Sequence, residues 1–220
     1  ELVKQFPKFV QTTYLRKFVS RLELYKKILH SHGTIVECGA LGADGMFAFA
    51  HFVEIFEPFN HLRRVIGFDT FEGFPTISNK DLPNGPTTPS KFLHVGGLRS
   101  DELEEILKLK SVFDDARPLK HIDRIEFVKG DATHTIPNYI QSHPELLISL
   151  LWLDFDIYEP TLTALKHFLP RMSKGSIIAF DELNHPLWPG ETVATLEALE
   201  INKYEVKRFT FGSSVSYIQI

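Results

Sequence analysis

The sequence predicts an α/β fold in which helices cover both faces of a mostly parallel sheet. Strand-like runs alternate with helix-like runs through the middle of the chain, and each of these strand-like runs is apolar throughout, as in strands buried on both faces. Two more strand-like runs, joined by a short turn, follow at the end. With 220 residues, 43% of them hydrophobic, the chain can bury one substantial core. We therefore expect a single domain over residues 1–220.

The first expected element is a helix. Residues 8–31 carry apolar side chains at helical spacing, and the run ends before Gly33, a residue that commonly stops helices. Residues 1–32 are therefore expected to form an N-terminal helical layer.

Five apolar strands are expected next, with helices between most of them. The strands are predicted at 34–40, 63–71, 124–132, 149–156 and 175–183. The helices are predicted at 44–59, 101–113, 137–147 and 160–172.

The end of the chain departs from this alternation of strands and helices. Residues 204–211 and 215–220 are strand-like and are joined by a Gly-Ser-Ser turn, which is typical of a hairpin. The total is then seven strands. A terminal antiparallel pair on a mostly parallel sheet favours the Rossmann-like class I methyltransferase fold over the NAD-binding type.

A long insertion interrupts the pattern at 76–121. Its first part is dense in Pro, Gly, Asn and Ser, and Ser100 with two following acids then favours the start of a helix. Long insertions beyond the carboxyl ends of strands are where substrate lids occur, so we expect a lid here. The alternative is a tolerated surface insertion, because long surface loops cost little free energy.

Charge and composition exclude some classes of function. The net charge is −4, with 24 Lys and Arg against 28 Asp and Glu, and no basic stripe is present, so nucleic acid is not an expected partner. Cys38 is the only cysteine and cannot form an internal disulfide, which fits a reducing compartment. No apolar run approaches the roughly 20 residues that span a bilayer, and the start lacks the core of a signal peptide. We expect a cytoplasmic protein without a membrane partner.

The first candidate motif is VECGALGADG, from Val36 to Gly45. Gly39 and Gly42 would let a ligand approach the backbone after the strand, although the run departs from the G-x-G-x-x-G fingerprint and such turns often serve packing alone. Glu37 lies in an otherwise apolar strand, and a buried carboxylate needs a cationic or hydrogen-bonding partner. The motif therefore points to nucleotide binding only in combination with others.

Two further strand ends supply that combination. Asp69 ends the second strand, where an acid can accept hydrogen bonds from both hydroxyls of a ribose. Asp131 ends the third strand, where it could meet the exocyclic amine of an adenine. Each aspartate could instead be an ordinary turn or helix-cap residue. Three such strand ends in order are nevertheless unlikely by chance.

Acidic side chains gather after the fourth and fifth strands. Asp154 and Asp156 are two residues apart and so point to the same side, and Asp181 and Glu182 end the neighbouring strand. Like charges held this close call for a cation, and all-oxygen ligands suit Mg²⁺. The alternative is that these acids cap helices or pair with Arg171 or Lys174.

The run from Leu153 to Glu182, with GFDTFEGFP upstream and PGE at 189–191, resembles the macrocin O-methyltransferase group of class I S-adenosylmethionine enzymes, which methylate sugar hydroxyls in bacterial natural-product pathways. The resemblance extends from about residue 33 to residue 191, and D-x-D-x-Y-E-x-T is its most specific part. It implies that Asp154, Asp181 and Glu182 are metal ligands and that Asp156 is the general base. The chain has Asp-Glu where relatives often have Asp-Asp, and His94 and His185 are lesser candidates for the base.

Together these features predict an S-adenosylmethionine-dependent, Mg²⁺-dependent O-methyltransferase. The acceptor is a sugar nucleotide or a finished glycoside, and Trp188, Tyr14 and Arg16 are further candidates near it. The alternatives are that Trp188 fills the core, and that Tyr14 is an aromatic residue on a packed helix and Arg16 a solvated charge, which is the favoured interpretation of these last two. The resemblance also implies a homo-oligomer. The residues expected to hold the cosubstrate are Glu37, Gly39, Asp69, Thr70, Phe71, Asp131, Ala132 and Asp154.

Other functions compete with this prediction. The same acids would serve a metal-dependent O-methyltransferase of a catechol or another phenol, which offers adjacent hydroxyls. A non-catalytic module that binds S-adenosylmethionine is a different class, but clustered carboxylates without a ligand would be an electrostatic liability. An NAD enzyme fits less well because of the terminal hairpin and the imperfect glycine pattern.

Overall fold

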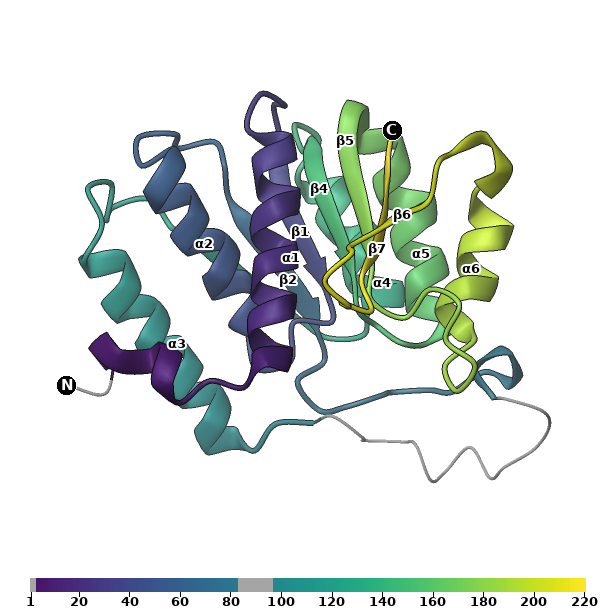
Figure 1. Ribbon diagram of the computed structural model, residues 1–220, viewed down its shortest axis with the longest axis horizontal. Coiled ribbons are helices and arrows are strands. Elements are labelled where there is room, and N and C mark those ends of the chain that lie inside the picture. Colours follow the sequence, from purple (N-terminus) through teal and green to yellow (C-terminus); the bar gives the residue numbers. More distant parts are fainter. Residues whose placement is uncertain (1–2, 83–96) are drawn as a thin grey trace.

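Seven strands form one mixed sheet in the computed structural model, which describes residues 3–82 and 97–220 (Figure 1). Their order across the sheet is β3-β2-β1-β4-β5-β7-β6. The first five strands are parallel, and β7 is antiparallel to both β5 and β6. The strands are β1 (Thr34–Cys38), β2 (Val65–Asp69), β3 (Ile125–Lys129), β4 (Ile148–Leu153), β5 (Met172–Phe180), β6 (Lys207–Arg208) and β7 (Ser216–Gln219).

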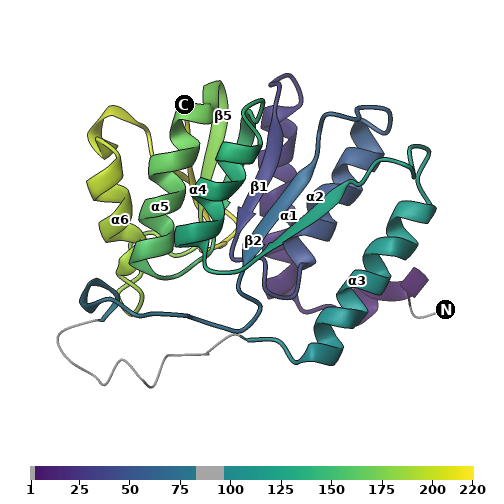
Figure 2. The same cartoon turned by 180° about the vertical axis from the view of Figure 1, so that it is seen from behind.

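Helices cover both faces of this sheet. One face carries α1, α2 and α3, and the other carries α4, α5 and α6 (Figures 1 and 2). Short 3-10 turns η1, η2, η4 and η5 connect them at Val3–Lys8, Asn79–Asp81, Leu169–Arg171 and Ile201–Lys203. The helices are α1 (Thr12–Ile28), α2 (Asp44–Phe56), α3 (Ser100–Asp115), α4 (Ala132–Ser142), α5 (Tyr158–Phe168) and α6 (Gly190–Ala198).

Alternating residues of the central strands build two separate cores. Leu150 and Trp152 of β4 pack with α1 and α2, whereas Leu151 and Leu153 pack with α4 and α5. All six residues of β4 are buried, which explains why its sequence is apolar throughout. The sequence-based fold class, with its mostly parallel sheet and terminal antiparallel pair, is confirmed.

Most elements differ from their predicted bounds by a few residues, and two of the differences have a visible cause or consequence. Helix α4 begins at Ala132 rather than near Pro137, because Asp131 accepts a hydrogen bond from the Thr133 N–H and caps the helix earlier. Strand β6 is shorter than the predicted run. Phe209, just after it, is buried and stacks on Tyr217 of β7.

The predicted insertion divides into parts with different roles. Residues 83–96 lie outside the described residues. Where the described chain resumes, it lies beside the turn after β2, because the Leu98 N–H donates to the Phe71 carbonyl at 2.9 Å. Helix α3 then packs on α2, with Phe113 against Phe47 and His51. Helix α3 is therefore packed against α2 in this structure, and the lid expected over 76–121 stays a prediction.

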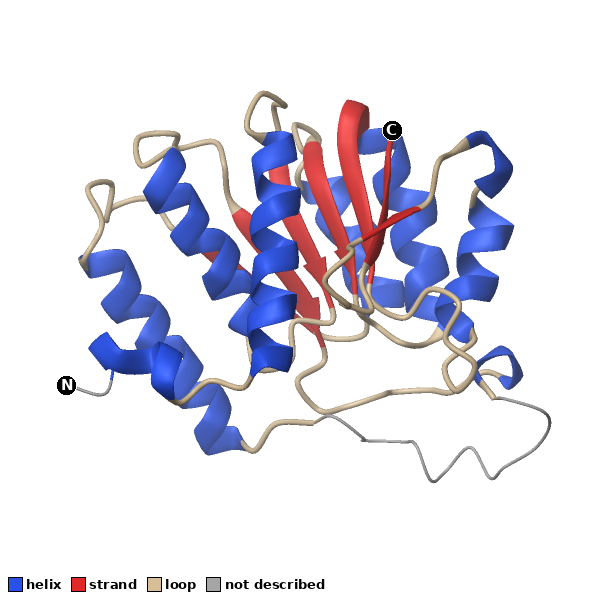
Figure 3. Ribbon diagram, in the orientation of Figure 1, coloured by secondary structure: helices blue, strands red, loops and turns tan. Residues whose placement is uncertain are grey.

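The carboxyl ends of β1, β2, β4 and β5 lie at one edge of the sheet (Figure 3). In the described chain, the non-glycine residues with positive φ all lie in the turns that leave this edge: Leu41, Ala43, Phe71, Asp156 and Asn184. Such conformations cost free energy and tend to occur at functional sites. Among the described residues, no helix has both the length and the apolar character needed to cross a bilayer.

Candidate active site

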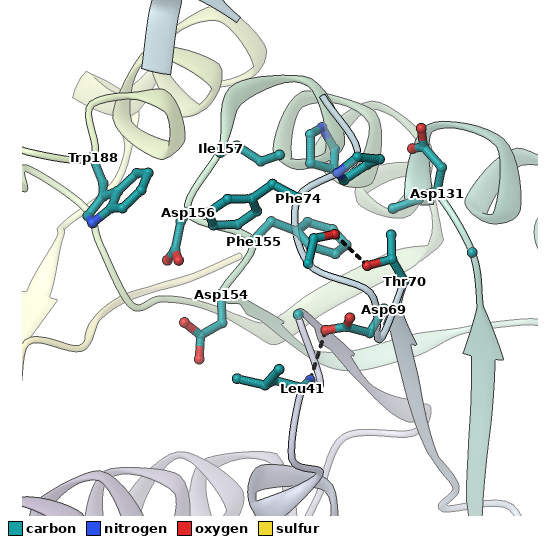
Figure 4. A pocket seen from close by; sticks show the side chains of 16 residues that line it. Leu41, Asp69, Thr70, Phe74, Asp131, Asp154, Phe155, Asp156, Ile157 and Trp188 are labelled. Carbon is teal, nitrogen blue, oxygen red and sulfur yellow. Dashed lines mark hydrogen bonds between the residues drawn. The ribbon is translucent and has the colours of Figure 1, made fainter. Parts of the chain in front are cut away.

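A pocket opens at this edge of the sheet and encloses about 720 Å³ of space, part of it open to solvent. Figure 4 shows two sides: Asp69, Thr70 and Asp131 lie on one, and Asp154, Asp156 and Trp188 lie on the other. The lining residues are Gly39, Leu41, Asp69, Thr70, Gly73, Phe74, Pro75, Gly130, Asp131, Ala132, Asp154, Phe155, Asp156, Ile157, Pro160 and Trp188.

Asp69 organises the loops on the first side. Its Oδ2 accepts a hydrogen bond from the Leu41 N–H at 2.8 Å, and its Oδ1 accepts one from the Phe71 N–H at 2.6 Å. Burial raises the pKa of this carboxyl group, and the backbone N–H groups oppose that shift because they stabilise the charged form. Asp69 thus joins the turn after β1 to the turn after β2.

The two glycines of the first motif have different roles. Gly39 lines the pocket with a φ of 90°, and a Cβ there would overlap the carbonyl of Asp154, so its small size is needed for packing of β1 beside β4. Gly42 has open space around it. We expected both glycines to make room for a ligand. At Gly39 the backbone of Asp154, rather than a ligand, occupies the position that a Cβ would take.

Asp131 lines the pocket and caps α4 at the same time. Its Oδ1 accepts hydrogen bonds from the N–H of Thr133 at 2.9 Å and from the Thr133 hydroxyl at 2.7 Å. The cap role that the sequence left open is thus present. Because Asp131 and the neighbouring Ala132 also line the pocket, the cap fixes this strand end beside the ligand space.

Two predicted cosubstrate residues do not line the pocket. Glu37 is only 2% exposed, and its Oε1 pairs with the Arg21 guanidinium at 3.2 Å, which supplies the cationic partner expected from the sequence. Burial raises the pKa of Glu37 and outweighs the opposite effect of Arg21. The Phe71 ring is buried against Phe127, so this residue reaches the site through its N–H on Asp69.

The carboxylates of Asp154 and Asp181 share one ammonium group. Nζ of Lys17, on α1, lies 2.9 Å from Asp154 Oδ2 and 3.2 Å from Asp181 Oδ2. Burial alone would lower the pKa of Lys17, but the two carboxylates outweigh it and raise the pKa. The predicted convergence of the two strand ends is therefore present, with a lysine between them.

Asp156 lies two residues after Asp154 and has a φ of 62°, in the left-handed region that only glycine adopts freely. Burial, together with the neighbouring carboxylates of Asp154, Glu182 and Asp181, raises the pKa of Asp156 to about 8. Near neutral pH such a group exchanges its proton readily, as a general base requires. It faces the pocket beside Asp154 (Figure 4).

Glu182 is positioned by a buried acid that sequence reasoning missed. Glu191 is fully buried, and its Oε1 accepts a hydrogen bond from the Glu182 N–H at 3.0 Å. Burial raises the pKa of Glu191 well above its ordinary value, with Asp154 and Asp181 adding to the effect. Nδ1 of His185 lies 3.5 Å from Glu182 Oε2, so this histidine is close to the acids. The PGE sequence was the available signal for Glu191.

The remaining candidates on the acceptor side fall in different places. Trp188 lines the pocket and contacts Phe74, with 5.7 Å between ring centroids. Tyr14 is 68% exposed and Arg16 is also exposed, and neither lines the pocket. Neither residue therefore reaches the pocket in this structure, and α1 directs Lys17 to the acidic strand ends instead. His94 lies outside the described residues.

Lys17 was also missed from the sequence, although a signal existed. Arg21, Leu24 and Ile28 form the buried stripe of α1, and Lys17 lies four residues before Arg21, where the stripe would continue. This spacing places Lys17 on the sheet-facing side of α1, and it is the signal that the sequence offered.

The acids fit a divalent cation in chemistry but not in their present arrangement. Oδ1 of Asp181 is buried and has no hydrogen-bond partner among the described residues, so a cation there would satisfy it. In the described ranges, however, no three His, Cys, Asp or Glu side chains are placed to hold a metal ion. Carboxylate oxygens are the donors that Mg²⁺ prefers, and the Lys17 ammonium contacts two of them in this structure.

In the comparison with known proteins, one protein-family model matches most of this chain. The model of the macrocin O-methyltransferase (TylF) family matches residues 24–194. No match was found among curated protein sequences.

Three solved structures give similar folds. A crystal structure of CalS11, calicheamicin methyltransferase, is 30% identical with a TM-score of 0.93, and the match covers 100% of this chain and 84% of that one. The apo structure of CalS11, described as a TDP-rhamnose 3'-O-methyltransferase of calicheamicin biosynthesis, is 31% identical with a TM-score of 0.83 and covers 100% and 85%. The O-methyltransferase NovP, at 18% identity and a TM-score of 0.68, covers 92% and 78% and shows the shared fold.

Proposed function

Because the chain belongs to the macrocin O-methyltransferase family, we propose that it transfers the methyl group of S-adenosylmethionine to a sugar hydroxyl with the help of a divalent cation such as Mg²⁺. The acceptor is a nucleotide-linked deoxysugar or a finished glycoside of natural-product biosynthesis. One observation carries the proposal: a single pocket joins Asp69 and Asp131 on one side to Asp154 and Asp156 on the other.

The cosubstrate occupies the first side in this proposal. Asp69 accepts hydrogen bonds from the ribose hydroxyls, and Asp131 accepts one from the adenine amine. Gly39, Thr70, Ala132 and Asp154 line the same space. Glu37 and Phe71 support it from behind, Glu37 through its pair with Arg21 on α1 and Phe71 through the backbone bond to Asp69.

The acceptor hydroxyl then lies on the second side, between the methyl group and Asp156. Its oxygen attacks the methyl carbon, a C–O bond forms, the C–S bond breaks, and S-adenosylhomocysteine leaves with the electron pair on sulfur. Asp156 takes the hydroxyl proton. Its pKa of about 8 makes it a stronger base than an ordinary carboxylate. The ring of Trp188 offers a flat apolar surface for a sugar face.

Asp154, Asp181 and Glu182 would hold the cation in this proposal. When bound, a divalent cation lowers the pKa of a hydroxyl and fixes its oxygen. Glu191 positions Glu182 through the hydrogen bond to its backbone N–H.

Calorimetry with S-adenosylmethionine, followed by Mg²⁺, tests the two halves of the site separately. We expect wild type to bind both, and we expect Asp154→Ala with Asp181→Ala to lose Mg²⁺ binding. A panel containing a nucleotide-linked deoxysugar, a glycoside and a catechol then identifies the acceptor by mass spectrometry. Methylation of the catechol alone would overturn the sugar assignment, and full activity in excess chelator would overturn the cation.

The expected homo-oligomer and the cytoplasmic location stay predictions. Sedimentation equilibrium of the purified chain measures the first of them.

A further inference from the structure

Lys17 is placed where a cation would bridge the two acidic strand ends. Its ammonium contacts Oδ2 of Asp154 and Oδ2 of Asp181, at 2.9 and 3.2 Å. These are hydrogen-bond distances, longer than the roughly 2.1 Å at which Mg²⁺ binds oxygen. The ammonium therefore uses two of the oxygens that the proposed cation would need.

The surroundings of this contact contain more negative than positive groups. Asp156, Glu182 and Glu191 lie near the pair, and Glu191 is fully buried with its Oε1 on the Glu182 N–H at 3.0 Å. Asp181 is 7% exposed, and its second oxygen has no hydrogen-bond partner among the described residues. One lysine thus satisfies this group of carboxylates only in part.

The side chain of Lys17 reaches solvent and is not enclosed by the site. Its side chain is 33% exposed, whereas Arg21, one turn further along α1, is 4% exposed and is fixed by Glu37 and Asp44. A swing of the lysine toward solvent therefore leaves the buried pair that attaches α1 to the sheet in place.

We propose that Lys17 and the divalent cation compete for the same oxygens of Asp154 and Asp181, so that this lysine sets the affinity of the site for the metal. The ammonium neutralises the strand ends when no metal is bound, and the cation displaces it on binding. This inference rests on the cation use proposed above.

Calorimetric titration with Mg²⁺ alone measures the competition. Lys17→Met removes the charge and keeps an apolar stem of similar length. We expect it to bind Mg²⁺ about tenfold more tightly than wild type or better, because a charge-assisted contact no longer has to be broken. Lys26→Met is the matched control, since Lys26 lies on the same helix and its one ion pair within the described ranges is with exposed Glu23, at 2.8 Å. Its Mg²⁺ affinity should equal that of wild type.

A second measurement uses wild type alone and does not depend on the folding of a variant. Reductive methylation followed by peptide mass spectrometry reports how accessible each lysine is. We expect Lys17 to be protected without metal and to be modified several-fold faster at saturating Mg²⁺, while Lys26 reacts equally in both conditions.

The outcomes separate this inference from the proposed function. Equal Mg²⁺ affinity in wild type and Lys17→Met, with no change in Lys17 labelling, overturns the competition and leaves the proposed cation intact. If neither protein binds Mg²⁺ while both bind S-adenosylmethionine, the cation itself is refuted and the competition is refuted with it. Tighter binding in the variant together with metal-dependent labelling supports both.

Discussion

Asp81 caps the helix that borders the acceptor side of the pocket: its Oδ1 accepts a 2.6 Å hydrogen bond from the backbone N–H of Tyr158, the first residue of α5. Its Oδ2 accepts a second one from the Ser78 N–H at 2.7 Å. Gly190 lies against this contact, and a Cβ there would overlap Asp81 Oδ1. The segment after β2 is thereby fixed to α5 and α6.

Asp81→Ala should lower the free energy of unfolding by about 1 to 2 kcal/mol, because a buried N–H loses its partner. Urea denaturation measures the change. Asp101→Ala is the control, since this aspartate is exposed and pairs with exposed Arg99. Equal stability of the two variants would show that the cap contributes nothing.

Gly45→Ala should destabilise the protein by about 3 kcal/mol or more, because the new methyl group would overlap Glu37 Oε1 and separate the buried pair with Arg21. Gly42→Ala is a close control: a Cβ at Gly42 meets no atom within 4 Å. Thermal unfolding of both variants is the measurement. A Gly45→Ala protein as stable as Gly42→Ala would contradict the assignment of Glu37 to a packed ion pair.

Asp156→Asn should raise stability by about 1 kcal/mol or more while slowing methyl transfer by about 10² to 10⁴. The variant removes a carboxyl group crowded by other acids, and Asn tolerates the positive φ at this position. The midpoint of thermal unfolding, the turnover rate and the affinity for S-adenosylmethionine are measured together. The affinity should not change, and retention of full turnover would transfer the role of base to another group such as His185.

The rate of methyl transfer should rise with pH with a midpoint above about 4 and below about 8, because Asp156 acts only in its deprotonated form and the proposed cation would lower the pKa of about 8 that this group has without metal. The profile of kcat/KM against pH is the measurement. A midpoint near 4, as for an exposed carboxylate, would show that Asp156 is not buried among like charges during the reaction.

The free energy of unfolding should fall as the pH rises, whereas the rate of methyl transfer should increase. The folded-state pKa of Asp156, about 8, lies above its unfolded value of about 4, so between these limits unfolding releases a proton. This contribution to stability is complete below pH 4 and is lost as the pH rises to 8. Urea denaturation at pH 5 and pH 8 should show a smaller difference for Asp156→Asn than for wild type. The same difference in both proteins would contradict the shift.

Much of the site was predictable because parallel strands bring their carboxyl ends to one edge. Asp69, Asp131, Asp154 and Asp156 each follow an apolar run, and the sheet order places them around one pocket. Lys17 was not predictable in the same way. Its contact with two strands depends on where α1 crosses the sheet, and no local pattern specifies that position.

The sequence by itself determined the alternation of strands and helices, the terminal antiparallel pair and the gathering of acids at the strand ends, since these follow from apolar periodicity and chain order. Tertiary structure alone decided which partner each charge has. Glu37 faces Arg21 rather than the pocket, Asp154 and Asp181 share Lys17, and Phe113 of α3 packs on Phe47 of α2. The physical reason is that burial patterns are local along the chain, whereas the neutralisation of a buried charge depends on residues that only packing brings within about 3 Å.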